Sequence, residues 1–597
     1  MRTLSTSIGL LLAFTHCLHA QWLTQSLDLK AGWNAVFLHV DASHTTLDSL
    51  VGNDPSNPIL EVWQWQPGST AQFIETPLEP NNLGSEWFSW VRGQAGAEFQ
   101  NLVGDSAYLV KVGATVGSYT WHIKGHPVAP RHQWRIDGLN LIGFSTAPNS
   151  PPNFAPFLEK STDLQELNTE LFQYVGGDIG PNNPVPVEGP LLNTTPVRRG
   201  EAYWIRNGEV FNRYFGPFEV ILPNPEGVNF RDNLGSQGFR LRNLSPDPLT
   251  ISLELVQSEL PVPSEQTPIT GIPPLLIRGQ LNTADFTYGH TSLPLAGTRT
   301  WTLNRRNQEG SEVQVVLGLD RSAIQGEPGD LLAGVLRFTD SLGYSQVDVS
   351  VSAEVSSPAG LWMGSASVTQ VGQYLKSFAR DGEDKPVLNA DGRYQVNNVN
   401  TNMAGVASPA PLRLIVHNPD AGQARLLQRV YFGFDSAKKY VVSNSETSLD
   451  PTRFADARRL SASHLPWSET NPGWPFDARM VQGAILKARV TTATGDQGAN
   501  PFLHTYHPDH DNLDALFQKE LARGVESYSI VRDITLSVLP PADDFEARTS
   551  SGLSFFGEYQ ETIQLLGRGT DARRYDVRGF FNLQRINDLP DLTLVQP

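Results

Sequence analysis

Apolar and polar residues alternate along many short segments of the chain, and this period of two predicts β-strands with one buried face. In Leu249–Leu255 and in Val347–Val351 every second residue is apolar. A β-hairpin is predicted where Leu412–Val416 and Ala424–Leu427 flank the segment 418–422, which reads Asn-Pro-Asp-Ala-Gly. Proline presets φ in such a turn and glycine permits the chain to reverse. These patterns predict a mainly β protein.

Helical periodicity is rare by comparison. One clear helix is predicted in the last third of the chain, where four apolar residues at i, i+3, i+4 and i+8 form one face. These residues are Leu513, Leu516, Phe517 and Leu521. Asp511 or Asn512 can cap the start of this helix, and Gly524 follows its end. Two short helices are also predicted, at 45–50 and 154–158.

Two segments of about 100 residues share four landmarks in the same order, which predicts tandem domains because solenoid repeats have shorter periods. Each segment begins with Gly-Trp-Asn or Gly-Leu-Asn and ends with an aromatic strand. The landmarks of the first copy are Gly32-Trp33-Asn34, Val62–Trp65, Ala107–Lys111 and Tyr119–Trp121. Those of the second copy are Gly138-Leu139-Asn140, Leu171–Tyr174, Ala202–Arg206 and Tyr214–Gly216.

The chain has 597 residues, which suggests about four domains. Its 51 glycines and 43 prolines fit many short strands joined by turns. The predicted fold is mainly β, with tandem small β-rich domains, an immunoglobulin-like β-sandwich and a C-terminal β-rich domain with one helix. The expected boundaries are 1–20 for a signal peptide, 21–127 and 128–226 for the tandem modules, 227–356 for the sandwich and 357–597 for the last domain.

The tandem modules resemble a β module found in large secreted bacterial multidomain proteins, a family of unknown function. The resemblance rests on Gly32-Trp33-Asn34 with Tyr108–Lys111, and on Gly138-Leu139-Asn140 with Tyr203–Arg206. It covers about 200 residues. The order of strands over 227–356 is similar to that of immunoglobulin-like spacer domains of secreted bacterial proteins. These resemblances imply an extracellular setting and a spacing role, and they imply no activity.

The first twenty residues predict export. Arg2 precedes the apolar run Ile8–Phe14, which at 1.5 Å per residue is far shorter than the roughly 30 Å core of a bilayer. A signal peptidase is expected to cut after Ala20. Cys17, the only cysteine, is lost with that segment, so the mature chain has no disulfide. We therefore expect a secreted bacterial protein, extracellular or periplasmic, without a transmembrane segment.

Charge and motifs exclude several function classes. With 45 basic and 62 acidic residues the net charge is −17, which argues against nucleic-acid binding because such binding depends on Lys and Arg contacts to phosphates. The chain lacks a G-x-S-x-G nucleophile elbow and a phosphate-binding G-x-x-x-x-G-K loop. No catalytic residue is predicted, and whether the protein is an enzyme stays open, with a non-enzymatic role favoured.

One stretch is a candidate divalent-metal site, because imidazole nitrogens and carboxylate oxygens are common metal ligands. Its candidate ligands are His504, His507, Asp509, His510 and Asp511. The calcium-loop and H-E-x-x-H patterns do not match this stretch. The H-x-H-x-D-H pattern of metallo-β-lactamase-like hydrolases comes closest, with Thr505 in place of its first ligand. The alternative interpretation is a loop in which Asp509 or Asp511 caps the following helix.

Nine of the 13 tryptophans lie before residue 230. Trp63 and Trp65 are two residues apart, so on a strand they point to the same face and could bind a sugar ring. The alternative is that these rings fill a core that has no disulfide to support it.

Three functions are compatible with the sequence. The first is a secreted or cell-surface bacterial protein with a binding or architectural role, whose partner is a polysaccharide or another surface protein. The second is a metal-dependent hydrolase with its site in the last domain. The third is a carbohydrate-binding protein that uses Trp63 and Trp65 as platforms.

Overall fold

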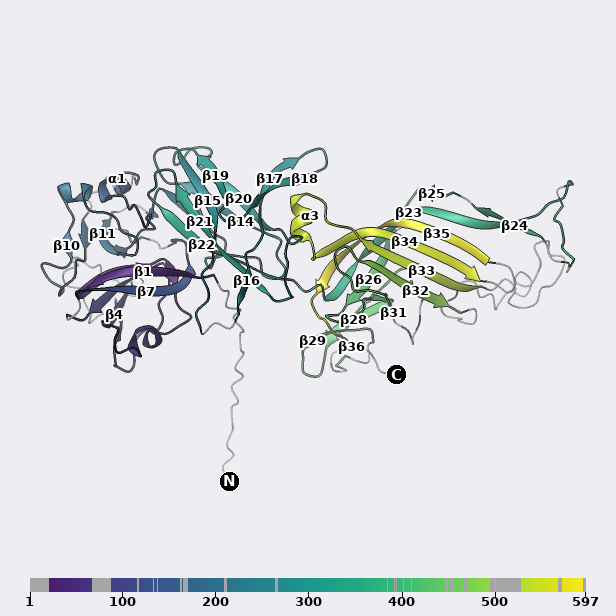
Figure 1. Ribbon diagram of the computed structural model, residues 1–597, viewed down its shortest axis with the longest axis horizontal. Helices are drawn as coiled ribbons and strands as arrows, with labels where there is room; N and C mark the ends of the chain where they lie inside the picture. Colours follow the sequence, from purple (N-terminus) through teal and green to yellow (C-terminus); the bar gives the residue numbers. More distant parts are fainter. Residues whose placement is uncertain are drawn as a thin grey trace, which may run out of the picture. The chain divides into compact units, whose positions relative to one another are not determined.

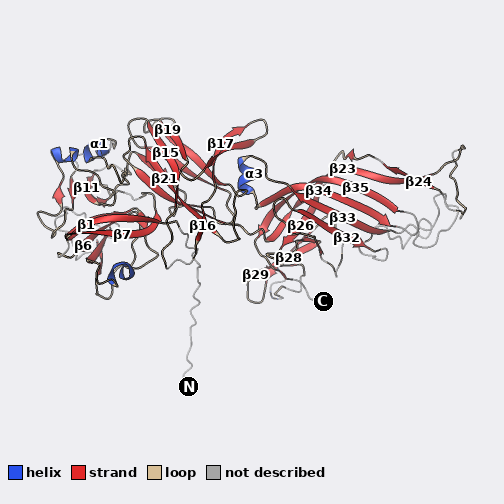
Figure 2. Ribbon diagram, in the orientation of Figure 1, coloured by secondary structure: helices blue, strands red, loops and turns tan. Residues whose placement is uncertain are grey.

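The computed structural model contains two compact units, each built mainly of β-strands (Figures 1 and 2). Unit 1 holds the residues up to Val355 together with Asp544–Thr549, and unit 2 holds Ser356–Asp543 and the residues from Ser550 onward. The structure describes residues 21–593 except for 67–86, 115–116, 132–133, 137, 162–163, 165–169, 209–211, 264–266, 384, 391, 393–394, 401, 410, 446–448, 451, 453–455, 467, 469–470, 472, 494–499, 501–527 and 567–571. This architecture confirms the predicted mainly β fold class.

Module 1, the name used here for residues 21–127, contains two sheets. The first has the order β1-β7-β3, and the second has the order β2-β6-β4-β5. The strands are β1 Leu23–Lys30, β2 Gly32–Leu38, β3 Val40–Asp41, β4 Ile59–Trp65, β5 Trp87–Val91, β6 Ser106–Val112 and β7 Ser118–Pro127. A short π-helix, η1, spans Asp48–Gly52 where a helix was predicted at 45–50. An apolar core lies between the two sheets and contains Leu27, Leu38, Trp90 and Trp121.

Module 2, residues 128–226, contains a four-stranded sheet of the order β8-β11-β9-β10. Its strands are β8 Gly138–Ile142, β9 Leu171–Gln173, β10 Val185–Pro186 and β11 Tyr203–Asn207. In both modules the sheet therefore runs first, last, second, third in chain order. Helix α1, Phe154–Leu158, forms where it was predicted, and η2 spans Gly189–Asn193. The segment Tyr214–Gly216 is not a strand, contrary to the prediction.

Equivalent asparagines hold the start of the first strand in each of these sheets. The Asn34 amide donates to Lys30 O (2.8 Å) and Gly32 O (3.1 Å), and its Oδ1 accepts from Lys30 N (2.9 Å). Asn140 makes the same pattern with Arg135 O (3.0 Å), Gly138 O (3.2 Å) and Arg135 N (2.7 Å). The Gly-x-Asn motif therefore closes a loop whose backbone groups would otherwise be buried without partners.

The two modules are joined along the free edge of β2. Trp33 N donates to Gly177 O (2.8 Å), Phe37 N donates to Gly200 O (2.9 Å), and Ala202 N donates to Ala35 O (3.1 Å). A Cβ on Gly32 would lie 2.4 Å from Gly177 O, so this approach requires glycine. Beneath the junction lies one continuous aromatic core that contains residues of both modules, including Trp33, Trp65, Trp134, Phe144 and Trp204.

Where a β-sandwich was predicted, unit 1 contains two further sheets, called the sandwich below, and these include β12 at the end of the range given to module 2. One sheet has the order β12-β14-β20-β17-β18, with strands at Phe218–Ile221, Ser236–Asn243, Glu312–Leu319, Leu275–Asn282 and Thr287–Leu293. The other has the order β13-β22-β21-β15-β19, with strands at Val228–Asn229, Gln346–Glu354, Leu331–Asp340, Leu249–Gln257 and Thr298–Leu303; β16, Ile269–Gly271, pairs with β21. The turn 246–248 leads from β14 in the first sheet to β15 in the second, so these strands are not paired with each other.

A segment from far along the chain completes the sandwich. Residues Asp544–Thr549, which form most of helix α3 (Phe545–Ser550), belong to unit 1. Phe545 is buried, and a Cβ on Gly318 of β20 would lie 2.6 Å from its ring. Arg548 Nη2 and Nε contact Asp320 Oδ2 at 2.5 and 3.1 Å. The pattern of the sequence had not predicted this contact.

Unit 2 is built around a large sheet of the order β31-β27-β26-β23-β35-β34-β33-β32. These strands span Gly473–Pro475, Arg425–Leu427, Pro411–Asn418, Gly360–Phe378, Ala572–Asn587, Ser554–Leu566, Ser529–Val538 and Ile485–Thr492; β24 (Val396–Asn400) and β25 (Ala404–Gly405) pair with β23. The predicted hairpin corresponds to β26 and β27, which pair at Val416 and Leu426. A second sheet has the order β30-β28-β29-β36, with strands at Arg458–Ser461, Arg429–Phe434, Tyr440–Ser443 and Leu592–Thr593.

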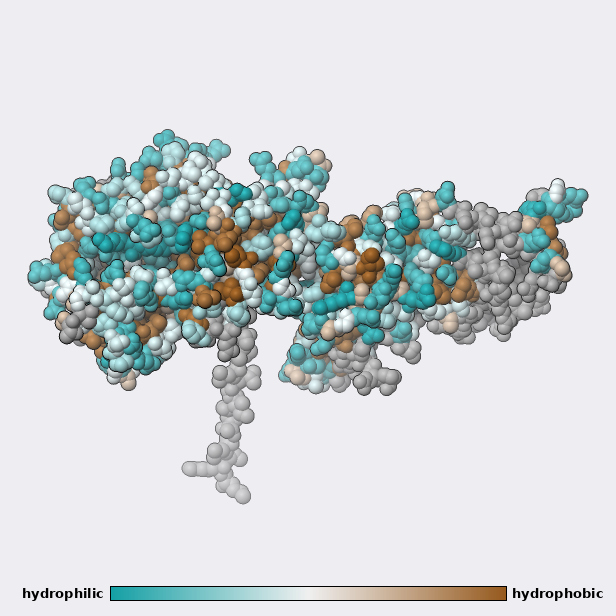
Figure 3. Space-filling view, in the orientation of Figure 1, coloured by the Kyte–Doolittle hydropathy of each residue, from teal (hydrophilic) through white to brown (hydrophobic). Residues whose placement is uncertain are grey.

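Several predictions fall outside the described residues: the signal peptide, 1–20, and the helix through Leu513–Leu521. Among the helices that the structure describes, none is long and apolar enough to cross a membrane. The visible face intersperses hydrophilic and hydrophobic residues, and apolar residues gather there in a few patches (Figure 3).

We expect the substitutions Asn34→Ala and Asn140→Ala to lower the free energy of unfolding of unit 1 by similar amounts. Asn34 makes four hydrogen bonds, including one of 3.4 Å to Val110 O, and Asn140 makes three. At roughly 1 kcal/mol net per bond, and less for the partly exposed ones, about 2–3 kcal/mol is expected. Denaturant unfolding followed by tryptophan fluorescence measures this, because ten of the 13 tryptophans lie in unit 1. The control is Thr120→Ala, which removes one exposed hydrogen bond to Asp28 and should change stability by less than about 1 kcal/mol. Equal effects of all three substitutions would contradict the structural role of the asparagines.

We expect Arg548→Ala to destabilise unit 1 although residue 548 is distant in sequence from the sandwich. It leaves the buried carboxylate of Asp320 with Ser322 Oγ (2.6 Å) as its remaining hydrogen-bond donor among the described residues. Loss of one partner of a buried pair costs about 3–5 kcal/mol, and about 2–3 is expected here because Arg548 is partly exposed. Arg240→Ala is the matched control, since it removes an exposed ion pair to Glu312 that Arg242 also contacts. A melting curve of unit 1 that is unchanged by Arg548→Ala would refute this prediction.

Candidate functional site

The candidate metal ligands His504, His507, Asp509, His510 and Asp511 lie outside the described residues. They belong to the connection between β32, which ends at Thr492, and β33, which begins at Ser529. Within the part of the chain that the structure describes, no group of three or more His, Cys, Asp and Glu side chains is placed to hold a metal ion. The metal site therefore stays a prediction.

Trp63 and Trp65 lie on β4 and belong to the aromatic core that modules 1 and 2 share. Trp65 is 7% exposed, and its ring contacts the Trp204 ring edge-on with centroids 5.3 Å apart. Trp63 is half-buried and packs against Trp33 at 4.8 Å, and its Nε1 donates to Glu61. The ring of Trp65 therefore has no open face for a sugar, and that of Trp63 is partly covered.

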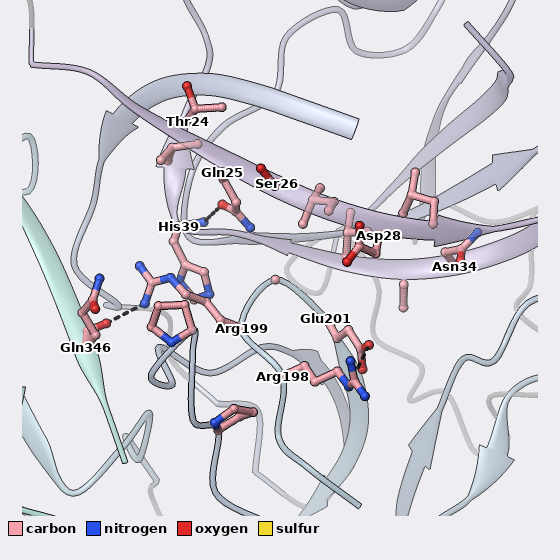
Figure 4. A pocket seen from close by; sticks show the side chains of 18 of the residues that line it. Thr24, Gln25, Ser26, Asp28, Asn34, His39, Arg198, Arg199, Glu201 and Gln346 are labelled. Atoms are coloured by element: carbon pink, nitrogen blue, oxygen red, sulfur yellow. Dashed lines mark hydrogen bonds and ion pairs between the residues drawn. The ribbon is translucent and has the colours of Figure 1, made fainter. Parts of the chain in front are cut away.

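A large polar cleft lies within unit 1, between module 1, module 2 and the sandwich (Figure 4). Its volume is about 770 Å³. We call it the junction cleft. Its walls come from β1, from β2 and β3 with the intervening His39, from the segment 196–201, and from β21 and β22. Side chains with amide, hydroxyl, guanidinium and carboxylate groups predominate in its lining, and the labelled residues in Figure 4 are all polar.

His39 lies at the inner part of the cleft wall and is 3% exposed. Its backbone N donates to Gln25 Oε1 at 2.8 Å, and Gln25 Nε2 donates to Phe37 O at 2.7 Å. Its Nδ1 lies 3.3 Å from Ser145 Oγ. None of the described residues offers a hydrogen-bond partner to its Nε2. Burial, together with the nearby charge of Arg199, holds the pKa of His39 well below 6.5, so its imidazole is neutral at pH 7.

The contact between His39 and Ser145 is not a catalytic pair. Ser145 is 2% exposed, so a substrate in the cleft cannot reach its hydroxyl. A serine nucleophile must also be open to the reacting carbonyl as well as hydrogen-bonded to its base. The geometry is that of a fixed, neutral polar group in the wall of the cleft.

Arg199 connects module 2 to the sandwich across one end of the cleft. Its Nη1 donates to Gln346 O at 2.6 Å, and its Nη2 lies 3.3 Å from Asp348 Oδ2. Arg337 Nε donates to Asp348 Oδ1 at 2.8 Å, and Gln346 Nε2 donates to Asp348 Oδ2 at 2.8 Å. Asp348 is 4% exposed, so one buried carboxylate faces two guanidinium groups. Burial lowers the pKa of Arg199, and Arg337 adds to this effect while Asp348 opposes it.

The opposite wall carries Glu201, which is held by neutral donors. Tyr203 OH donates to Glu201 Oε2 at 2.9 Å, and Gln173 Nε2 donates to the same oxygen at 2.8 Å. The pKa of Tyr203 is raised well above 10 by burial and by the charge of Glu201, so the phenol stays a donor. Arg198 Nε lies 3.9 Å from Glu201 Oε1, and 62% of the Arg198 side chain is exposed. Arg198 is therefore a solvent-exposed cation of the cleft, as is Lys30 of β1.

The junction cleft had not been predicted from the sequence. Its residues come from four separate stretches, around 23–40, 148–201, 259 and 337–348. Each stretch by itself resembles an ordinary strand or turn. The pair Arg198-Arg199 directly before Gly200 is one of five adjacent cation pairs in the chain, so it does not mark the cleft by itself.

No protein-family model matches the chain, and no curated protein matches it. Two solved structures of proteins of unknown function from Bacteroides ovatus are similar to it. The first is 9% identical to this chain and has a TM-score of 0.15; the match covers 61% of this chain and 94% of the other. The second is 11% identical and has a TM-score of 0.13; the match covers 63% of this chain and 97% of the other. The pilus adhesin SpaC from Lactobacillus rhamnosus GG is 9% identical, covers 91% of this chain and 54% of the adhesin, and has a TM-score of 0.10. These TM-scores are too low to support an argument about this chain.

We expect unit 1 to lose stability as the pH falls below about 6.5, and His39 to be one cause. The unfolded chain takes up a proton on this histidine near pH 6.5, whereas the folded state resists protonation to a much lower pH. Protons therefore favour unfolding in the window below 6.5, by up to about 1.4 kcal/mol per pH unit for one group.

The test compares the wild type with His39→Gln by denaturant unfolding at pH 7 and pH 5. The variant should lose less stability between the two pH values, because it removes the group that binds the proton. Thr302→Ala, at an exposed position on β19 where the hydroxyl contacts Thr250, is the control and should leave the pH dependence unchanged, because it alters no titratable group. An identical pH dependence in the wild type and in His39→Gln would show that His39 does not contribute.

Proposed function

We propose that the protein is a non-enzymatic binding and architectural protein, exported to the bacterial surface, and that unit 1 binds polysaccharide in the junction cleft. The observation that carries the proposal is the cleft itself, a volume of about 770 Å³ whose walls come from three β domains. Sites that bind small ligands commonly have volumes of about 300–1,000 Å³ and occur at domain junctions.

The walls of the cleft are fixed before any ligand arrives. Backbone hydrogen bonds join β2 to module 2, and the shared aromatic core lies beneath that junction. Arg199 then joins module 2 to the sandwich through Gln346 and Asp348. A preformed site avoids most of the entropy cost of ordering side chains and loops on binding. This supports a recognition role, and it equally supports an architectural role as a rigid spacer.

The chemistry of the lining favours a hydroxyl-rich ligand. Amide and guanidinium groups donate hydrogen bonds, and carboxylates accept them. An apolar ligand would displace water from the exposed polar side chains of the lining, such as Asp28, Lys30 and Arg198, without replacing their hydrogen bonds, at a cost of about 1–3 kcal/mol for each group left unpaired. A sugar chain presents hydroxyl groups that both donate and accept, so it can satisfy many of them at once.

The surface location rests on the predicted signal peptide and on the resemblance of the modules to those of secreted bacterial proteins. The hydrolase alternative depends on the histidine and aspartate stretch 504–511. Metal analysis of untagged mature protein decides it, because a hydrolase of this kind needs a stoichiometric metal ion and the binding protein proposed here does not.

The proposal predicts that the mature protein binds oligosaccharides on a glycan array and that Arg198→Ala weakens this binding. Arg198 is exposed in the cleft, so its loss removes a charged hydrogen-bond donor, worth about a tenfold change in Kd, without unfolding unit 1. Lys487→Ala, at an exposed position of β32 in unit 2, is the matched control and should bind like the wild type. Absence of binding to every glycan, or turnover of a bound one, would refute the proposal.

A further inference from the structure

The end of the junction cleft near Arg199 carries more positive than negative charge. Arg199 and Arg337 both contact the carboxylate of Asp348, at 3.3 and 2.8 Å. Gln346, the third group on this carboxylate, is neutral. The side chains of Arg199 and Arg337 are 15% and 29% exposed, so water screens their charge only in part. Two cations and one anion leave a local net charge of +1 in the wall of the cleft.

The other carboxylates that line the cleft have cations of their own or lie on another wall. Arg198 lies 3.9 Å from Glu201. Asp28 and Lys30, both on β1, add one charge of each sign. Glu259 accepts from Thr24 N and Oγ1 and lies 3.2 Å from Lys124. A buried charge without a full partner is costly, and a ligand that supplies the missing charge recovers part of that cost.

We propose that the junction cleft binds an acidic saccharide, and that the single anionic group of one sugar unit lies at the Arg199–Arg337 end. This inference rests on the proposed function and names the class of its ligand. A carboxylate or a sulfate ester carries the one negative charge that the site lacks. Guanidinium groups bind such planar or trigonal oxygen sets through two parallel hydrogen bonds.

The size and lining of the cleft exclude a small free anion as the whole ligand. The cleft continues from the Arg199–Arg337 end past His39 and Gln25 to Asn34, over a volume of about 770 Å³. A free anion would fill one end and leave the polar groups of the rest to water. A short oligosaccharide would fill the cleft, with its charged unit at one end and its hydroxyl groups toward exposed side chains of the lining such as Lys30 and Arg198.

The chain offers a sharp test at Arg337. Replacing Arg337 with Gln removes the surplus charge and keeps a donor near Asp348, which then pairs one to one with Arg199. Arg337→Lys keeps the charge and changes the shape of the side chain. Both variants leave the contacts of Arg199 to Gln346 O and Asp348 in place, so folding is not expected to fail. Melting curves confirm that each variant is folded before binding is measured.

The experiment uses the full mature chain and titrates matched probes: oligosaccharides of neutral hexoses, the same chains with one hexuronate unit, and the same chains with one O-sulfate ester. The wild type should bind at least one acidic series about tenfold more tightly than the neutral series. Arg337→Gln should bind acidic and neutral probes equally, and Arg337→Lys should keep the preference. The acidic series that binds more tightly shows whether a carboxylate or a sulfate ester supplies the charge.

Several outcomes would overturn the inference. Equal binding of neutral and acidic probes by the wild type would overturn it and leave the proposed polysaccharide-binding function standing. An acidic preference that survives in folded Arg337→Gln would also overturn it, because the surplus charge would then not be the cause. Binding of no probe at all would overturn both the inference and the proposed function.

Discussion

Unit 1 depends on one backbone contact, the pairing of the free edge of β2 with module 2. A four-stranded sheet of this size has an open edge whose N–H and C=O groups need partners. Trp33 N and Phe37 N find them in Gly177 O and Gly200 O. The approach is so close that only glycine fits at position 32. Because the two backbones meet there, the tryptophans of both modules share one core. This core stabilises the junction without a disulfide, since the chain has a single cysteine.

The same contact sets the position of the polar groups of the cleft. Gly200 accepts from Phe37, so the preceding residues Arg198 and Arg199 are held beside β2 and β3. Arg199 then reaches Gln346 and Asp348 of β22, and His39 follows β2 directly. The charge pattern of the cleft is thus a consequence of how three β domains are joined. Neither module contains the site by itself, and neither does the sandwich.

The sequence predicted those features that depend on local patterning. Alternation predicted β15, β22 and β26 with β27, and helix α1 forms where it was expected. Landmarks such as Gly32-Trp33-Asn34 and Gly138-Leu139-Asn140 identified the first strands of two sheets with the same strand order. Local patterning failed where partners are distant. The turn 246–248 joins two sheets, Trp65 is covered by Trp204 of the other module, and His39, Arg199 and Asp348 meet across more than 300 residues of chain. The pattern of residues along the chain does not show which edge of one sheet pairs with which loop of another domain.

The segment Asp544–Thr549 has a consequence for the order in which this protein matures. A ribosome makes the chain from its N-terminus, so the sandwich strands exist long before Phe545 and Arg548 are added. Closing a contact over so great a separation is slow, because the loop entropy must be lost before the contact stabilises anything. The sandwich, whose strands are made early, therefore completes its folding late. Until then Asp320 and the surface over Gly318 stay uncovered, so the nascent sandwich must survive as an incomplete domain while the rest of the chain follows it.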